Sequence, residues 1–423
     1  MKYLVYAVCA LALLSGCAQT KKMAPKEGRE SVQSRLTNPV IQKSNSGVEL
    51  TEAQTISDWH SANYNTQNKI PHAQIDGFST KIWKENVGKG ISSSTLHLPD
   101  PIVHQDVIYT LDGKLRLTET DKNGHAIWDI ELRTEKNIPA VASIGLTYDN
   151  GIIYVVAGDG IVYAVQPHGE IIWQHDTESI LRSSPVVKNG HLYVLSANNE
   201  LIVLNTKDGS LAWNYKNLET STNLMGMGKP AISQGIAVVP FSSGEVIAFD
   251  DKTGNPLWSN TLSAYRTFNQ VADLTHILAD PVIEGNVVYL IGNAHKMGAF
   301  KLKTGEPIFV QPIGGQTTPV TVGNTLFMVT NKDSLIAINK YNGNLIWEKD
   351  LYSQTQKQVA WHTPIPVNNQ ILITSSEGDF IAFDMIDGTE TKKIKTDKLF
   401  VSPIAYNNGL LFYTNEANLI MYR

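Results

Sequence analysis

The feature that most constrains this fold is a repeating unit that runs from about residue 77 to the end of the chain. Its clearest copy covers residues 183–216, with apolar runs at 191–196 and 201–205. A turn at Asn189-Gly190 precedes the first run, a turn near residues 197–199 separates the two, and a turn at Asp208-Gly209 follows the second. Trp213 lies four residues after Gly209. Short apolar runs bounded by Gly, Asn or Asp are typical of strands joined by tight turns. Each unit therefore predicts four antiparallel strands.

Two series of residues mark the register of the repeat. The first is the leading position of each unit, which suits proline because the first residue of a strand breaks no ladder hydrogen bond. It is occupied, at intervals of 38 to 51 residues, by Pro101, Leu146, Pro185, Pro230, Pro281, Pro319, Pro364 and Pro403. The second series pairs a turn glycine with an aromatic residue four positions later: Gly124/Trp128, Gly169/Trp173, Gly209/Trp213, Gly254/Trp258, Gly305/Phe309 and Gly343/Trp347. Lys392 replaces the aromatic residue after Gly388, so that unit is degenerate.

Four-stranded units of about 40 to 45 residues are typical of propeller blades. The last unit, from Pro403 to Arg423, has room for only three strands, and a strand-like segment containing Trp83 precedes the first leading proline. Pairing the two closes a ring and removes exposed sheet edges. We therefore expect an all-β fold for residues 77–423: an eight-bladed β-propeller of four-stranded antiparallel blades, closed by an N-terminal strand in the last blade. The tryptophans are expected to pack between blades, because each can bury about 150–250 Å².

The N-terminus has the pattern of a bacterial lipoprotein. Lys2 precedes an apolar stretch from Tyr3 to Leu14, which is too short to span a bilayer, and the stretch ends in Leu14-Ser15-Gly16-Cys17. We predict that residues 1–16 are a lipoprotein signal peptide and that Cys17 is the lipid attachment site; an ordinary secretory signal with a chance cysteine is the alternative. Cleavage would leave Cys17 as the one cysteine, so no disulfide is expected. Residue 18 is Ala rather than Asp. By resemblance to enterobacterial lipoproteins, this favours the outer membrane.

Residues 17–76 differ from the repeat, being rich in Ser, Thr, Asn and Gln and poor in strand pattern. We predict the lipidated cysteine followed by a flexible linker or arm, in which Trp59 and Tyr64 are candidates to pack on the body. The formal net charge of the chain is −5, and the sequence has no cluster of basic residues that would indicate a polyanion partner. These features argue against a nucleic-acid partner.

No catalytic or metal-binding motif stands out. The chain lacks Gly-x-Ser-x-Gly and His-Glu-x-x-His, and Gly88-Lys89-Gly90 does not have the spacing of a phosphate loop. One remaining cysteine excludes a Cys-rich zinc site. Histidines of the repeat region that could serve as metal ligands are scattered over different units: His104, His125, His168, His191 and His295. We therefore expect no enzyme activity, no cofactor and no metal.

The repeat, with its Pro-Val-Val, Val-Tyr, Thr-Gly and Trp elements, resembles the PQQ-like β-propeller repeat. Within that superfamily, the chain from about residue 55 onward is similar to the BamB family of outer-membrane assembly lipoproteins. Trp83 followed by Val87-Gly88-Lys89-Gly90 matches that family's opening motif, and Asn293 to Thr304 with Gly314 to Pro319 resemble alphaproteobacterial members.

This resemblance implies a non-catalytic subunit of the machinery that assembles outer-membrane β-barrel proteins. Its implied partners are the POTRA domains of the central BamA-like barrel, the other assembly lipoproteins and, possibly, nascent outer-membrane proteins. Its implied location is the outer membrane, lipid-anchored and facing the periplasm. Two alternatives are a ligand-binding propeller, for example for sugars, and a PQQ-dependent dehydrogenase. The second needs a vicinal disulfide, which the mature chain cannot form.

The resemblance also assigns candidate partner-binding residues. Matched on Gly226 and Pro230, the family's two leucines and arginine fall on Thr222, Leu224 and Met225, and only Leu224 keeps its type. Two acidic positions fall on His276 and Leu278, so their charges are lost. We expect a more apolar contact by Leu224, Met225, Ile277 and Leu278, within or near the preferred contact loop Phe268–Leu278. The alternative is that these are ordinary loop residues that cover the core.

Overall fold

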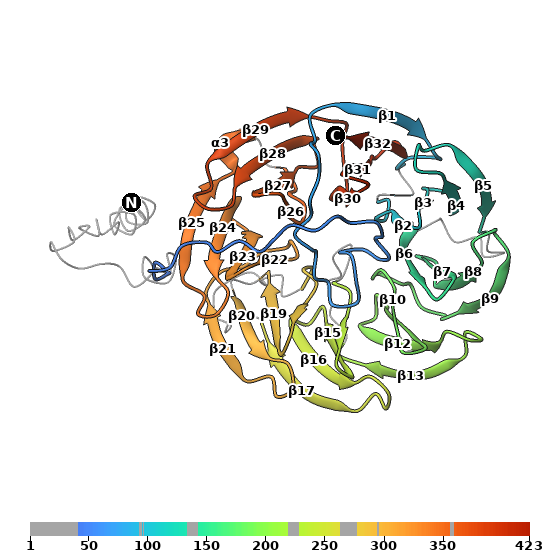
Figure 1. Cartoon of the computed structure of the whole chain (residues 1–423). Coiled ribbons are helices and arrows are strands. Elements are labelled where there is room, and N and C mark those ends of the chain that lie inside the picture. Colours follow the sequence, from blue (N-terminus) through green and yellow to red (C-terminus); the bar gives the residue numbers. More distant parts are fainter. Residues whose placement is uncertain are drawn as a thin grey trace, which may run out of the picture. The chain divides into compact units, whose positions relative to one another are not determined.

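The computed structural model describes residues 41–92, 95, 97–132, 143–218, 228–262, 277–293, 296–355 and 359–423. The described residues form eight four-stranded antiparallel sheets that surround a common centre (Figure 1). The predicted eight-bladed β-propeller is confirmed. Because each blade is a meander, neighbouring strands in the chain are also neighbours in the sheet.

The strands of the first four blades have these bounds. Blade 1 contains β2 (Ile102–His104), β3 (Val107–Leu111), β4 (Arg116–Thr120) and β5 (Ala126–Glu131). Blade 2 contains β6 (Ser143–Asp149), β7 (Ile152–Ala157), β8 (Ile161–Val165) and β9 (Ile171–Asp176). Blade 3 contains β10 (Val186–Lys188), β11 (His191–Leu195), β12 (Glu200–Asn205) and β13 (Leu211–Lys216). Blade 4 contains β14 (Ala231–Ser233), β15 (Ile236–Pro240), β16 (Glu245–Asp250) and β17 (Pro256–Thr261).

The remaining blades follow the same order. Blade 5 contains β18 (Val282–Glu284), β19 (Val287–Gly292), β20 (Lys296–Lys301) and β21 (Pro307–Gln311). Blade 6 contains β22 (Val320–Val322), β23 (Thr325–Val329), β24 (Ser334–Asn339) and β25 (Leu345–Asp350), after which comes the short helix α3 (Tyr352–Thr355). Blade 7 contains β26 (Ile365–Val367), β27 (Gln370–Thr374), β28 (Asp379–Asp384) and β29 (Glu390–Lys395). Blade 8 contains β30 (Ile404–Tyr406), β31 (Gly409–Tyr413), β32 (Asn418–Tyr422) and β1 (Lys81–Asn86).

Burial along the strands reflects their position in the blade. The second and third strands, such as β11 and β12, have almost continuous buried runs because both faces pack against neighbouring blades. The fourth strand, such as β13, alternates between exposed and half-buried residues because it forms the outer rim. The hydrophobic core therefore lies between the blades.

The aromatic series packs each blade on the next, as predicted. Trp258 of blade 4 covers Gly305 in the turn before β21, where an added Cβ would lie 2.7 Å from the ring atom Cδ2. Gly305 has φ +68°, which a residue without a Cβ adopts at little steric cost. The Trp258 Nε1–H also donates to the Leu302 carbonyl at 2.8 Å. Trp128, Trp173 and Trp347 make the same kind of bond to the following blade.

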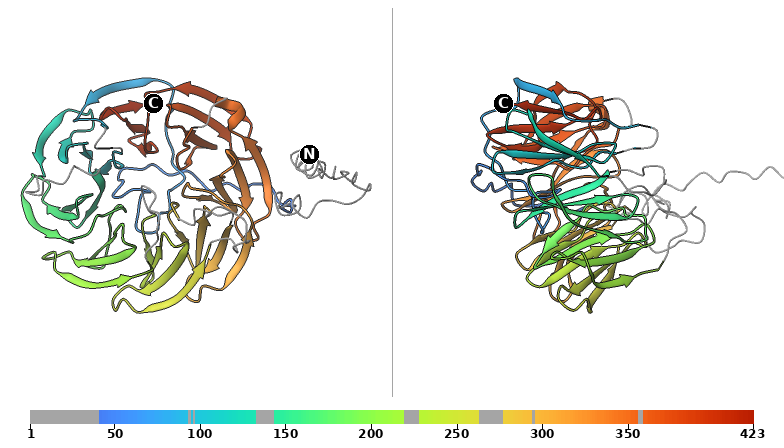
Figure 2. Two further views of the ribbon diagram at one scale, coloured as in Figure 1. Left: turned by 180° about the vertical axis from the view of Figure 1, so that it is seen from behind. Right: turned by 90° about the vertical axis from the view of Figure 1, so that its right-hand side faces the viewer.

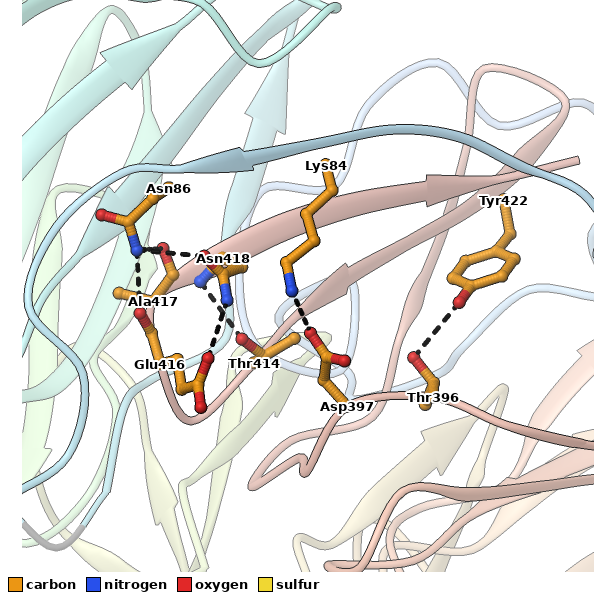
Figure 3. Close-up of polar contacts among 9 residues, drawn as sticks. All are labelled: Lys84, Asn86, Thr396, Asp397, Thr414, Glu416, Ala417, Asn418 and Tyr422. Carbon is orange, nitrogen blue, oxygen red and sulfur yellow. Dashed lines mark hydrogen bonds and ion pairs between the residues drawn. The ribbon is translucent and has the colours of Figure 1, made fainter.

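The ring closes between the two ends of the repeat region, in blade 8. Strand β1 pairs antiparallel with β32, with Lys84 opposite Ile420 and Asn86 opposite Asn418. Figure 3 shows the Asn86 amide donating to the Glu416 carbonyl and to Asn418 Oδ1, each at 3.0 Å. Lys84 also forms a 2.6 Å ion pair with Asp397, which precedes β30. The predicted closure by an N-terminal strand is confirmed.

Closure explains why the seventh unit lacks its aromatic residue. Blade 8 takes its outer strand from the N-terminal side of the chain, so it has no turn glycine on which an aromatic residue of β29 could pack. Lys392 instead extends over the Phe78 ring, 5.5 Å from its centroid, and contacts the Ser79 hydroxyl. The residues that lead into β1 therefore replace the usual tryptophan contact.

Residues 41–78, which we call the N-terminal arm, lie across the centre of the propeller on one face, as the side view shows (Figure 2). The sequence predicts a flexible linker or arm here, with Trp59 and Tyr64 as candidates to pack on the body. The described part is packed: Trp59 and Ile70 are each 2% exposed and belong to one cluster with Val103, Val367 and Ile404, against which Tyr64 also packs. The backbone of the arm bonds to the innermost strands because these are edge strands, whose channel-facing N–H and C=O groups have no partner within the blade. Within the described residues, no helix is long and apolar enough to cross a membrane.

Candidate functional site

The two predicted partner-binding segments leave the propeller on the same face. Segment 219–227 joins the outer strand β13 to the inner strand β14, and segment 263–276 joins β17 to β18. Thr222, Leu224, Met225 and His276 lie outside the described residues. In an antiparallel meander, connections between blades emerge opposite the turn between the first and second strands. The arm lies on those turns, for example at Asn408, so the described residues that flank these segments, Leu218 and Ile277, lie toward the opposite face.

The two described candidates have different surroundings. Ile277 is 2% exposed and packs in a hydrophobic cluster with Ala231, Ile283 and Phe300. Leu278 is half-buried. The burial of Ile277 agrees with the alternative that these candidates are ordinary loop residues that cover the core. Contact of either residue with a partner stays a prediction.

Sequence reasoning missed Leu218, which follows β13 directly. Its side chain is 77% exposed, the highest value among the large hydrophobic residues that the structure describes. Its backbone is nevertheless fixed, because the Leu218 carbonyl accepts a 2.7 Å bond from Asn199 and its N–H donates to Asn217. A single exposed hydrophobic side chain is normal on a protein surface, and Leu218 is distinguished by its fixed backbone at the base of segment 219–227.

The N-terminal arm fills the mouth of the central channel. The Asn68 side chain is fully buried and donates to the carbonyls of Pro230 and Pro281, at 3.3 and 2.9 Å. Further hydrogen bonds reach the blades on all sides. They join the arm to Val103, Tyr148, Ile232, Ile283, Asn324, Pro366 and Asn408, which belong to blades 1, 2, 4, 5, 6, 7 and 8. This mouth of the channel is therefore occupied by the chain itself.

Three ionisable groups lie directly before leading prolines: Lys229 and Asp280 are buried, and Asp100 is half-buried. Asp280 accepts hydrogen bonds from the Lys229 backbone N–H at 2.8 Å and from the Asn63 side chain at 2.7 Å. Burial lowers the pKa of Lys229 to about 8, against the attraction of Asp280 and Asp100. Burial likewise raises the pKa of Asp100 to about 6. Of the three groups, Asp280 bonds both to the Lys229 backbone and to the arm, which points to a structural role for this carboxylate.

One histidine that seemed isolated in the sequence has neighbours in the structure. His104, at the end of β2, lies beside Asp58 and His60 of the arm, and its ring stacks on Tyr148 with centroids 4.1 Å apart. Burial and repulsion by His104 lower the pKa of His60 below its usual value. His125 and His168 instead pair with exposed carboxylates on other strands, and His295 lies outside the described residues.

Comparison with known proteins agrees with this architecture. The structure resembles the crystal structure of BamB from Moraxella catarrhalis, with a TM-score of 0.70 and 16% identity over 81% of this chain and 99% of that one. A quinohemoprotein alcohol dehydrogenase from Comamonas testosteroni also matches, with a TM-score of 0.64 and 11% identity over 88% of this chain and 81% of that one. At such identities, these likenesses concern the fold alone.

The sequence comparisons are more specific. The outer membrane protein assembly factor BamB of Yersinia pestis is 24% identical over 84% of this chain and 92% of its own length. The factor of the same name from Escherichia coli is 25% identical over 83% of this chain and 90% of its own length. The family model described as outer membrane protein assembly factor BamB matches residues 121–349 and 312–399. The chain therefore belongs to the BamB family of outer-membrane protein assembly factors.

Proposed function

We propose that this chain is a non-catalytic lipoprotein subunit of the outer-membrane β-barrel assembly machinery, anchored through Cys17 and facing the periplasm. In this role it holds the POTRA domains of the BamA-like barrel protein, next to other assembly lipoproteins, and aids the folding and insertion of outer-membrane proteins. The observation that carries the proposal is the N-terminal arm, which occupies the channel mouth that a ligand-binding propeller would keep open.

The contact surface that we propose lies on the face opposite the arm, around blades 3 to 5. Leu218 supplies a fixed apolar side chain there, and Leu278 lies half-buried where the chain enters blade 5. The candidates Thr222, Leu224, Met225 and His276 belong to the segments that connect these same blades. An apolar anchor held by a rigid scaffold loses little entropy on binding, so a small surface can suffice.

The alternatives make different use of the channel. A sugar-binding propeller would need a groove of aromatic and amide side chains, whereas Trp128, Trp173 and Trp258 are used between blades. The likeness to the quinohemoprotein dehydrogenase concerns the fold, and Cys9 and Cys17 are too far apart in sequence for a vicinal disulfide. Neither alternative explains an exposed, fixed leucine beside the segment 219–227.

The test is a pull-down of the full-length lipoprotein from detergent-solubilised native membranes, with bound proteins identified by mass spectrometry. We expect recovery of a POTRA-containing outer-membrane barrel protein. The double variant Leu218→Asp/Leu224→Asp should reduce that recovery at least tenfold. Leu211→Asp is the matched control, because Leu211 is also exposed, at 52%, and lies at the other end of β13.

Clean recovery of the bait without such a barrel protein would contradict the assembly role. Equal recovery by the double variant and by the control would leave the role intact but refute the proposed surface. A variant of Cys17, Cys17→Ser, tests the anchor separately: we expect it to leave the membrane fraction while keeping its fold.

A further inference from the structure

The arm crosses blade 1 in a way that brings three metal-ligating side chains together. Trp59 and Val103 form an antiparallel bridge in which each N–H donates to the other's carbonyl at 2.8 Å. Side chains alternate along extended backbone, so Asp58 and His60 point away from the buried Trp59. His104 follows Val103 and therefore lies on the same side. The bridge thus fixes the backbone on both sides of the cluster.

The ligand atoms of these residues form a small triangle. His60 Nε2 lies 3.0 Å from His104 Nδ1, Asp58 Oδ1 lies 3.1 Å from His104 Nδ1, and Asp58 Oδ1 lies 3.7 Å from His60 Nε2. Zinc binds imidazole nitrogen and carboxylate oxygen at about 2.0–2.2 Å, which separates tetrahedral ligand atoms by roughly 3.3–3.5 Å. The observed separations bracket that value, so one ion fits at the centre of the three atoms.

Hydrogen bonds among Asp58, His60 and His104 do not give all three ligand atoms a suitable partner. A neutral imidazole nitrogen carries either one proton or one lone pair, and His104 Nδ1 faces both His60 Nε2 and the Asp58 carboxylate. If His104 Nδ1 donates to Asp58, it cannot also accept from His60. If it accepts from His60, it turns a lone pair toward the carboxylate. A cation at the centre would satisfy all three atoms at once.

Neighbouring groups orient the ligands. The Ser57 hydroxyl donates to Asp58 Oδ2 at 2.6 Å, and the Gln105 backbone N–H donates to Asp58 Oδ1 at 3.0 Å. Tyr148 stacks on the His104 ring and lies 5.2 Å from the His60 ring, so both imidazoles are restrained. Such outer contacts are typical of metal sites. The side chains of Asp58, His60 and His104 are 37%, 43% and 23% exposed, which leaves an approach for an ion from solvent.

We propose that Asp58, His60 and His104 bind a divalent transition-metal ion of the zinc class, with one coordination position open to water. Two imidazoles and one carboxylate are the donors that Zn²⁺ accepts readily, and they are unsuited to Mg²⁺ or Ca²⁺. The ion would clip the N-terminal arm to the first blade. Because the unfolded chain lacks this triangle, binding stabilises the folded form.

The test uses the full-length chain in mild detergent, purified with an affinity tag that contains no histidine and freed of metal with EDTA. Calorimetric titration with ZnCl₂ should give one site per chain. His104→Gln and His60→Gln should each weaken that binding at least tenfold. The matched control is His168→Gln, because His168 also pairs with a carboxylate, Glu170, but on an exposed turn without a third ligand.

A second measurement separates loss of the site from loss of the fold. The metal-free variants should unfold at the same temperature as the metal-free parent, and one equivalent of ZnCl₂ should raise the unfolding temperature of the parent and of His168→Gln only. X-ray absorption of the zinc-loaded parent should show imidazole scattering from two ligands. If the parent takes up no zinc, or if His104→Gln and His60→Gln bind it as tightly as the parent, the proposal is wrong.

Discussion

Replacing a turn glycine that faces a tryptophan should be far more damaging than replacing a glycine with the same backbone in open space. In Gly305→Ala, the new Cβ would lie 2.7–2.9 Å from Trp258 Cδ2, Cε3 and Cγ, where contacts of about 3.5–4.0 Å are normal. The ring must move by about 1 Å, which breaks its bond to the Leu302 carbonyl. Overpacking of about 1–3 kcal/mol and a lost hydrogen bond of about 1 kcal/mol add to a backbone penalty of about 1–2 kcal/mol. We expect a total of about 3–6 kcal/mol.

Gly285→Ala, in the same blade, is the control for the backbone. Gly285 has φ +58°, close to the +68° of Gly305, but an added Cβ there meets no atom within 4 Å. Urea denaturation of both variants, followed by far-ultraviolet circular dichroism, should place the stability of Gly305→Ala about 2–4 kcal/mol below that of Gly285→Ala. In a Trp258→Ala background this difference should vanish. Equal losses in the two single variants would refute the idea that the tryptophan–glycine contact joins the blades.

Three further outcomes follow from the arm and from one buried histidine. Trp59→Ala should remove about 3–5 kcal/mol of packing and abolish hydrogen-exchange protection of the Val103 amide, with the blade 4 amides unchanged. Asn68→Ala should lower the unfolding temperature by leaving the carbonyls of Pro230 and Pro281 without a donor; an unchanged temperature would show that water replaces the amide. Burial lowers the pKa of His362 to about 4, below its value near 6.5 in the unfolded chain. The neutral side chain therefore makes its full contribution to the free energy of unfolding above pH 6.5, and this contribution is lost as the pH falls through 4. Relative to His362→Gln, the parent should therefore lose at most about 3 kcal/mol between pH 7 and pH 4, measured from urea midpoints.

The blades could be predicted from the sequence because each unit repeats the same short pattern of residues. A leading proline, a turn glycine and an aromatic residue four positions later recur in nearly every unit, and the contact between Trp258 and Gly305 is the physical reason for that spacing. The closing strand could be predicted because Trp83 lies outside the first complete unit. The degenerate position at Lys392 was visible, but its partner, Phe78, belongs to the non-repeating region.

An arm that packs through Trp59 and Tyr64 could be predicted, but its path across the blades and the cluster on it could not, because their contacts span long distances in the chain. Asn68 bonds to Pro281 over 213 positions, and no local pattern encodes that partner. Asp58 and His60 have the two-residue spacing of an extended strand, but nothing in the sequence says that this strand pairs with Val103 and so meets His104. Leu218 shows the same limit, because sequence alone does not distinguish an exposed leucine after a strand from a buried one.

Closure by β1 means that the first strand of the propeller to be synthesised is among the last to pair. Asn86 meets Asn418 across 332 positions, so the strand that is made first has no partner until the last blade exists. Docking of the arm is delayed further, because the residues that it bonds to come from blades 1, 2, 4, 5, 6, 7 and 8. Pairing over such separations is slow, since the entropy of closing a long loop must be lost before any contact forms. Until then Trp59, Ile70 and Phe78 stay exposed, so the arm docks only on a completed ring.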